Sequence, residues 1–201
     1  MPGAPDQVMV RPGDTLYSIA WRYDLDYRDL ARWNGIGPNF RILAGQPLRL
    51  RPPAGSPVPR ARAPGDAPRP ATPAAGASTA TGPSLAWVWP TEPASTRAVP
   101  GGGLLLMGSS GQEVRAAAAG RVVYTGSGLR SYGQLLIIRH SESLLSAYAH
   151  NRELLVREGQ EVAPGQPIAR MGEAGRQAVL YFEIRVNGKP VDPLPYLSGR
   201  K

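Results

Sequence analysis

A segment near the middle of the chain, residues 51–84, most constrains what this sequence can fold into. It holds 9 Pro, 9 Ala and 4 Gly, and Val58 is its one large aliphatic residue. Such a composition buries too little apolar surface to offset the conformational entropy that is lost on ordering. We therefore predict a disordered Pro/Ala-rich linker over 52–84, between an N-terminal domain over 7–51 and a C-terminal domain over 85–198.

Composition excludes several classes of site in both domains. The chain has no cysteine, so disulfides, thiolate catalysis and cysteine-bound metals are excluded, and it has two histidines, His140 and His150. The net charge of +8 is spread along the whole sequence. Because no segment concentrates basic residues among aromatic ones, we do not expect nucleic acid as a partner. A polyanionic wall polymer, an anionic membrane surface and an ordinary solvated surface remain open as readings of this charge.

The sequence also bears on membrane attachment. No apolar run approaches the length of a membrane span. The first ten residues, MPGAPDQVMV, lack the basic and apolar regions of a secretory leader. We therefore expect either a cytoplasmic chain or one whose leader lies outside the given sequence, and membrane contact only if such a leader carries a lipid anchor.

The N-terminal domain has the pattern of a small βααβ fold. A short strand is predicted over Val8–Val10, and Asp14 and Thr15 then open a helix with Leu16, Ile19 and Ala20 on one face. A second helix over Tyr27–Trp33 ends at Asn34-Gly35. Apolar residues on both sides of an Ala-Gly-Gln turn predict a closing strand; they are Ile42, Leu43, Leu48 and Leu50.

This domain resembles the LysM domain, a peptidoglycan-binding fold. The matching residues are Val10–Leu16, Ile19, Ala20, Leu30, Asn34 and Ala44–Leu48. The resemblance implies a sugar groove between two loops, with Gly13, Asp14, Thr15 and Leu16 on one side and Asn34, Gly35, Ile36 and Pro38 on the other. Loops commonly carry binding residues, and Asp14 and Thr15 are also expected to cap the first helix.

The C-terminal domain reads as a mostly antiparallel β fold. Short strands separated by Gly-containing turns predict a sheet or sandwich. The candidate strands are Leu104–Met107, Glu113–Ala117, Arg121–Thr125, Gln134–Arg139, Leu144–His150, Pro167–Met171 and Val179–Val186. In the last of these both alternating faces are mostly apolar, so neither face resembles ordinary solvated surface.

The C-terminal domain resembles the lysostaphin-like (LytM-type) zinc metallopeptidases over Trp89–Leu197. The landmarks are Trp89-Pro90, Gly108–Gly111, Ala118–Tyr124, Tyr132-Gly133, Ile138–His140, Ala147–His150, Glu158–Val162, Pro164–Gln166, Met171-Gly172, Phe182–Arg185 and Asn187–Pro193. Carried over position by position, the family's two early zinc ligands fall on Gly101 and Leu105. Its paired histidines fall on Val179 and Tyr181. Only His150 remains as in active members.

These replacements predict that the domain is not an enzyme and needs no cofactor. Zinc sites use three or four donors from Cys, His and carboxylates, whereas Gly101, Leu105 and Val179 offer none and neutral tyrosine is a poor ligand. Without the metal there is no activated water. We expect instead a protein-binding groove formed by Leu105, His150, Val179 and Tyr181. The alternative is that Leu105, Val179 and Tyr181 fold inward and close the groove into core.

A LysM domain, a linker and a degenerate LytM domain together resemble the NlpD/EnvC group of murein hydrolase activators, most closely its NlpD branch. The resemblance implies a non-catalytic activator of N-acetylmuramyl-L-alanine amidases, bound to peptidoglycan by LysM. It also implies the periplasm, with outer-membrane association at the division septum. Two alternatives remain: a wall-binding protein without amidase activation and, less favoured, an endopeptidase that uses His150 and an unrecognised metal.

Overall fold

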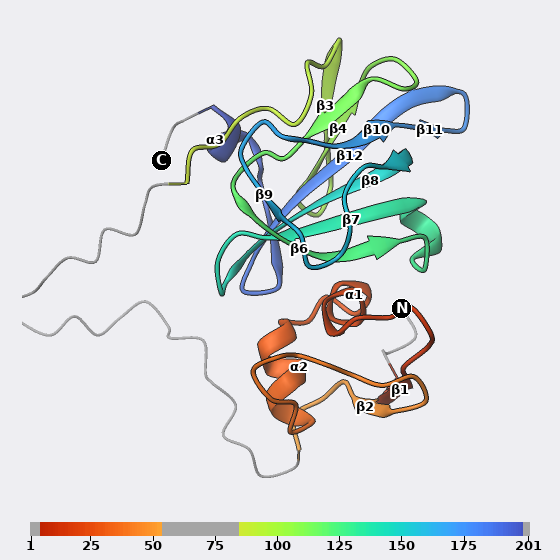
Figure 1. Cartoon of the computed structure of the whole chain (residues 1–201), viewed down its shortest axis with the longest axis vertical. Helices are drawn as coiled ribbons and strands as arrows, with labels where there is room; N and C mark the ends of the chain where they lie inside the picture. The colour runs from red at the N-terminus through yellow and green to blue at the C-terminus, as the bar shows by residue number, and fades with distance from the viewer. Residues whose placement is uncertain (1–4, 54–84, 199–201) are drawn as a thin grey trace, which may run out of the picture.

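The computed structural model describes residues 5–53 and 85–198, which form two modules that lie against each other (Figure 1). We call residues 5–53 the LysM module, after the family that their sequence resembles, and residues 85–198 the sheet module. The predicted linker falls on residues 54–84 for all but its first two positions, and those residues lie outside the described part of the chain.

The LysM module has the predicted βααβ order. Strand β1 (Gln7–Met9) pairs antiparallel with β2 (Pro47–Arg49), and helices α1 (Leu16–Arg22) and α2 (Tyr27–Trp33) lie between them in sequence. The Thr15 hydroxyl accepts a hydrogen bond from the backbone of Ser18, whose hydroxyl in turn binds the Thr15 N–H, so both orphan donors at the start of α1 are satisfied. The closing strand is shorter than predicted, because Ile42 and Leu43 precede the turn as irregular chain and Leu43 is 75% exposed.

The sheet module is mostly antiparallel, as predicted. The sheet runs in the order β3-β4-β12-β8-β7-β6-β9, and β10 joins β5 to β8 beside this path. The strands are β3 (Ser95–Val99), β4 (Gly103–Met107), β5 (Glu113–Arg115), β6 (Gly120–Gly126), β7 (Gln134–Arg139), β8 (Leu144–Leu154), β9 (Glu161–Val162), β10 (Pro167–Met171), β11 (Glu173–Ala174), β12 (Gln177–Val186) and β13 (Lys189–Val191). Two short helical segments, η1 (Arg130–Tyr132) and α3 (Leu194–Leu197), complete it.

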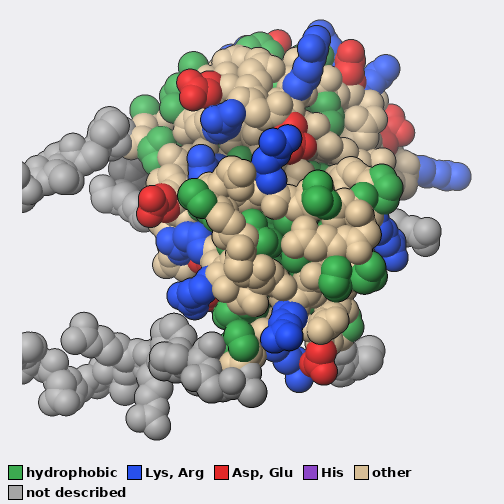
Figure 2. All heavy atoms as spheres, turned by 60° about the horizontal axis from the view of Figure 1, so that its bottom comes forward, with side chains coloured by type: hydrophobic (Ala, Val, Ile, Leu, Met, Phe, Trp, Pro, Cys, Tyr) green, Lys and Arg blue, Asp and Glu red, His purple; other side chains and the backbone are tan. Residues whose placement is uncertain are grey.

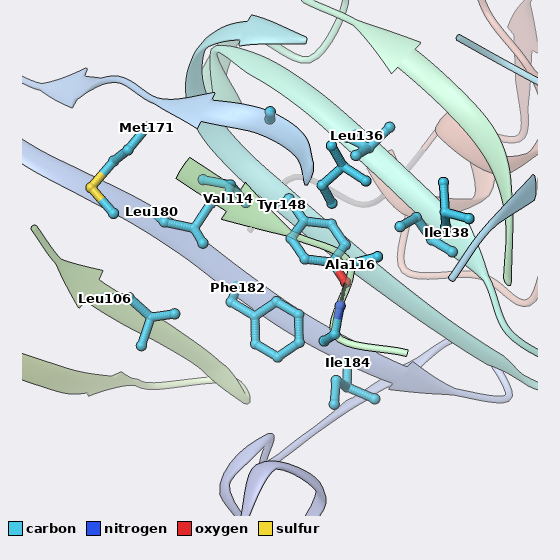
Figure 3. Packing of buried hydrophobic residues seen from close by; sticks show 14 of the residues in the cluster. Leu106, Val114, Ala116, Leu136, Ile138, Tyr148, Met171, Leu180, Phe182 and Ile184 are labelled. Atoms are coloured by element: carbon cyan, nitrogen blue, oxygen red, sulfur yellow. Dashed lines mark hydrogen bonds between the residues drawn. The ribbon is translucent and has the colours of Figure 1, made fainter. Parts of the chain in front are cut away.

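One face of β12 packs into the core of the sheet module. Leu180, Phe182 and Ile184 are fully buried there with Tyr148, whose ring lies 5.2 Å from that of Phe182 (Figure 3). The Tyr148 hydroxyl accepts a hydrogen bond from the Ala117 N–H at 2.8 Å, so its polar end is satisfied inside the core. This face is apolar because it lies in the hydrocarbon interior.

The opposite face of the same sheet is covered by the LysM module. A second buried cluster contains residues of both modules, including Trp21 and Tyr27 from the helices and Val123, Ile137 and Ala147 from β6, β7 and β8. In Figure 1, α1 lies next to this side of the sheet. Both faces of β12 are therefore mostly apolar because both are covered, one by the core and one in part by a second module.

Candidate functional site

The sheet brings three of the four predicted groove residues together. Tyr181 of β12 pairs directly with Leu105 of β4 on one side and with Ala149 of β8 on the other. His150 follows Ala149, and its left-handed backbone (φ 62°) interrupts the alternation of the strand. Its ring consequently lies 6.5 Å from the Tyr181 ring. Leu105, His150 and Tyr181 form what we call the Tyr181 patch.

The fourth residue, Val179, lies deeper than the others. It shares the Tyr181 face of β12 but is 3% exposed, whereas Leu105, His150 and Tyr181 are each partly exposed. A binding partner would therefore reach three of these side chains, whereas Val179 lies next to them along β12 and is buried.

The Tyr181 ring lies across the sheet toward β4. An ideal Cβ built on Gly103 would come within 2.5 Å of this ring, so the close approach requires glycine at that position. The ring also meets Tyr132 of η1 at 5.7 Å between centroids, and its hydroxyl donates a hydrogen bond to the Glu183 carboxylate. Burial, with the neighbouring Glu183 charge, raises the pKa of Tyr181 well above its ordinary value, so the phenol stays protonated.

The residues of this patch do not fit a zinc ion. Among the described residues, no group of three or more His, Asp or Glu side chains could hold a metal. The nearest carboxylate, Glu183, is already bound by the Tyr181 hydroxyl and by Arg185. Gly101 lies in the turn between β3 and β4, where a Cβ would meet open space, but glycine supplies no donor.

The two histidines differ in their surroundings. Burial lowers the pKa of His150, so its imidazole is neutral near pH 7. His140 is held as a structural group, with Nδ1 2.7 Å from the Ala119 carbonyl oxygen and Nε2 2.7 Å from Ser146 Oγ. Burial lowers its pKa to about 4.

A charged pair that sequence reasoning missed connects the Tyr181 patch to the LysM module. Arg185, 3% exposed, donates from Nε to Glu183 at 2.5 Å, and its guanidinium carbon lies 3.8 Å from the centroid of the Trp21 ring. Its Nη1 donates to the Trp21 carbonyl oxygen at 3.1 Å, and Nη2 pairs with Asp24 at 2.9 Å. The signal in the sequence was a pair of charges at alternate positions of a strand that is otherwise apolar on both faces.

The predicted sugar-loop residues divide into exposed and structural positions. Asp14, Thr15 and Pro38 line one cavity between the modules, so the two loops do meet there. Asn34 instead joins α2 to β2, because its side chain bonds the Leu30 and Arg49 backbones at 2.7 to 2.9 Å. The remaining positions serve the loops and the core: Gly13 and Gly35 have positive φ, Leu16 is fully buried, and Ile36 packs on the cluster shared by the modules.

Comparison with known proteins identifies both modules. Residues 8–51 match the LysM domain family and residues 100–193 match peptidase family M23. A Lipoprotein NlpD/LppB homolog of Pseudomonas aeruginosa is 42% identical, over 99% of this chain and 79% of its own length. The Murein hydrolase activator NlpD of Salmonella typhimurium is 36% identical, over 95% of this chain and 68% of its own.

The fold of the sheet module is also found in a solved structure, that of Csd3 from Helicobacter pylori. It has a TM-score of 0.51 and 25% identity, and the match covers 56% of this chain and 35% of that protein. Among the described residues, no helix is both long and apolar enough to cross a bilayer. With two family matches in order and relatives aligned over nearly its whole length, the chain belongs to the NlpD family of murein hydrolase activators.

Proposed function

We propose that this chain is a non-catalytic activator of N-acetylmuramyl-L-alanine amidases that act on septal peptidoglycan in the periplasm. The observation that carries the proposal is the Tyr181 patch. The resemblance places zinc ligands at Leu105 and Tyr181 and an assisting histidine at His150. These three residues lie together, and among the described residues no group of His, Asp or Glu side chains could hold a metal. The names of the relatives, murein hydrolase activator and lipoprotein, support the class of partner and the compartment.

The patch has the chemistry of a protein-binding surface. Tyr181 and Tyr132 present two aromatic rings, and Leu105 adds an aliphatic side chain, all partly exposed. Aromatic residues of this kind dominate the energetics of protein interfaces. The Tyr181 hydroxyl is already satisfied by Glu183, so the ring can be covered by a partner without leaving an unpaired donor.

Activation then follows from differential binding. An amidase has a resting and an active arrangement, and a ligand that binds the active one better shifts the population toward it. In this scheme the zinc and the hydrolysis belong to the amidase. The LysM module holds the activator on the wall, which raises the effective concentration of the amidase near its substrate.

The test is release of dye from labelled peptidoglycan by a purified amidase, with and without the full chain. We expect stimulation by the wild-type chain and binding of the amidase about tenfold weaker for Tyr181→Ala, because the main aromatic anchor is lost. Leu194→Ala is the matched control, since Leu194 is 39% exposed on α3.

The outcomes separate the alternatives. Wall binding without any stimulation would replace this proposal with that of a wall-binding protein. Cleavage of muropeptide crosslinks by the chain alone, abolished by a chelator, would show instead that it is an endopeptidase.

A further inference from the structure

We propose that the interface between the two modules, which we call the seam, forms a second part of the glycan-binding site. This part recognises a carboxylate on the wall polymer. The inference rests on the proposed wall binding by the LysM module and deepens it. A cavity of about 490 Å³ opens at the seam. The LysM module contributes Asp14, Thr15 and Pro38 to its lining, and the sheet module contributes Arg121, Arg139 and Glu158.

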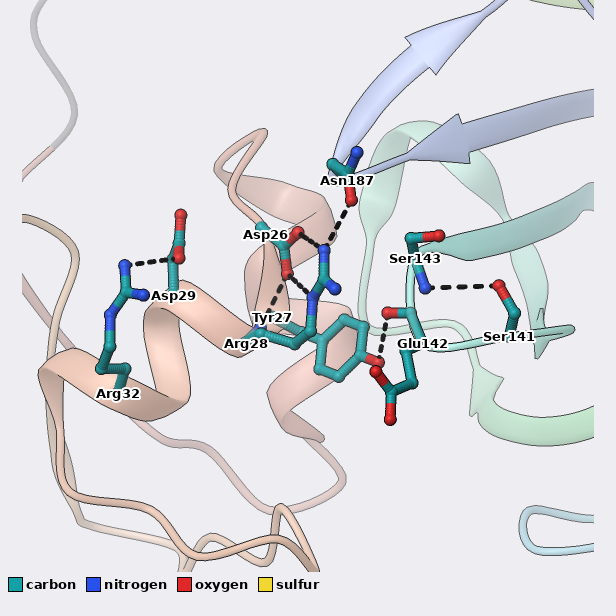
Figure 4. A network of polar contacts seen from close by, with 9 residues as sticks. All are labelled: Asp26, Tyr27, Arg28, Asp29, Arg32, Ser141, Glu142, Ser143 and Asn187. Atoms are coloured by element: carbon teal, nitrogen blue, oxygen red, sulfur yellow. Dashed lines mark hydrogen bonds and ion pairs between the residues drawn. The ribbon is translucent and has the colours of Figure 1, made fainter. Parts of the chain in front are cut away.

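The seam is a fixed interface and can hold a defined site. The Tyr27 hydroxyl donates to the Glu142 carbonyl oxygen at 2.7 Å, and Arg28 donates to the Asn187 side chain at 2.6 Å (Figure 4). At Gly188, a Cβ would come within 2.6 Å of the Asp26 nitrogen, so the backbones of the two modules are nearly in contact.

The charge of the cavity favours an anion. Asp14 does not add free negative charge, because it pairs with Arg22 at 2.9 Å. Among the described residues, the side chains of Arg41 and Arg121, both at this cavity, make no hydrogen bond or ion pair. Figure 2 shows Lys and Arg side chains spread over the side of the molecule that carries the LysM module.

Arg139 and Glu158 complete the charged lining. Burial raises the pKa of the Tyr17 hydroxyl to about 12, although the Arg139 charge lowers it, so the phenol stays neutral and leaves the arginine charge uncancelled. Burial also raises the pKa of Glu158, because it disfavours the charged carboxylate. Within the described part of the chain, three arginines (Arg41, Arg121 and Arg139) therefore line this cavity with one acid that makes no ion pair, Glu158.

The rest of the lining suits a sugar. Tyr17 and Phe40 line the cavity, and their rings lie 5.9 Å apart in an edge-to-face arrangement. Such rings offer an apolar surface to the C–H face of a pyranose, and the Thr15 and Asn39 groups offer polar contacts at its rim. Peptidoglycan joins both chemistries, since its sugars carry either a free lactyl carboxylate or a peptide with carboxylates. Arginine recognises either by charge-assisted hydrogen bonds.

The experiment measures binding of three oligosaccharides to the full chain by calorimetry. The probes are a neutral N-acetylglucosamine oligomer, a peptide-free N-acetylglucosamine–N-acetylmuramic acid oligomer, and the same oligomer with its stem peptides. We expect one or both anionic probes to bind about tenfold more tightly than the neutral one, and the stronger of the two identifies the source of the carboxylate. Added salt should reduce the difference.

Arg121→Gln is the decisive variant, since its exposed side chain can be changed without disturbing the core. It should lose the preference for the anionic probes and retain binding of the neutral one. Arg176→Gln, an exposed arginine in the turn between β11 and β12, is the control and should keep the preference. A wild-type chain without the preference, or an Arg121→Gln variant that keeps it, overturns the inference. A wild-type chain that binds none of the probes refutes wall binding by the LysM module instead.

Discussion

The two faces of β12 carry residues in the same alternating pattern but are stabilised by different physics. Leu180, Phe182 and Ile184 lie in the hydrocarbon core, where each contributes through the area that it removes from water. On the other face, Glu183 and Arg185 are equally buried, but they are held by ion pairs and an aromatic ring. The comparison teaches that burial on this strand has two origins, one within the sheet module and one between the modules.

The largest loss of stability is expected for a substitution on the core face of β12. Phe182→Ala should lower the free energy of unfolding of the sheet module by about 4 kcal/mol, because it removes a buried ring and leaves a cavity. Urea denaturation followed by circular dichroism measures this. A loss below about 1 kcal/mol would mean that this face is not the closed interior described above.

A somewhat smaller loss of stability is expected for a substitution at the seam between the modules. Arg185→Met should destabilise the docked pair by about 3 kcal/mol, because it leaves the buried Glu183 carboxylate without its cation and removes the contact with Trp21. Small-angle scattering should show the LysM module released while the sheet module stays folded. Global unfolding of the sheet module in this variant would contradict the separation of the two faces.

A smaller effect is expected in how the free energy of unfolding depends on pH, and it should distinguish the two faces of the sheet. His140 binds Ser146 behind the core face, and burial lowers its pKa from 6.5 to about 4 in the folded chain. The unfolded chain therefore binds more protons than the folded chain between these values, so stability falls as the pH falls through this window. We expect the free energy of unfolding to be about 2 kcal/mol lower at pH 5 than at pH 7.

Two glutamine variants show how much each histidine contributes to this pH dependence. His140→Gln should flatten most of it. His150→Gln should remove a part with the same sign, because burial lowers the pKa of His150 as well. If the free energy of unfolding depends on pH in the same way in both variants, the dependence comes from carboxylates instead.

Much of the fold could be predicted from the sequence, because local patterns determine it. The limits of β7 and β10 follow from their apolar residues, and Thr15 marks the start of α1. Strand β3 was not predicted, because four of its five residues are exposed at the edge of the sheet and carry no apolar alternation.

The seam could not be predicted in the same way. Docking of the LysM module depends on contacts such as Arg185 with Trp21, which are 164 residues apart. No local pattern reports such a contact. Two signs were available in β12: both of its faces are mostly apolar, and one of them carries the charges of Glu183 and Arg185. They indicated that the second face is covered without showing what covers it. The Tyr181 patch was found because the resemblance to a peptidase supplied the positions to inspect.

The path from Tyr181 through Glu183 to Arg185 has a consequence for how the proposed activities would be spaced. The first and last of these residues are four positions apart on one strand, which is about 13 Å. Arg185 is in register with Leu145 of β8, and Leu145 is in register with Arg139 of β7, which lines the cavity between the modules. A hydrolase bound at Tyr181 and a glycan bound in that cavity would therefore be held at a set separation by one sheet. The docked chain would then set the distance between the glycan that it binds and the bond that its partner hydrolyses.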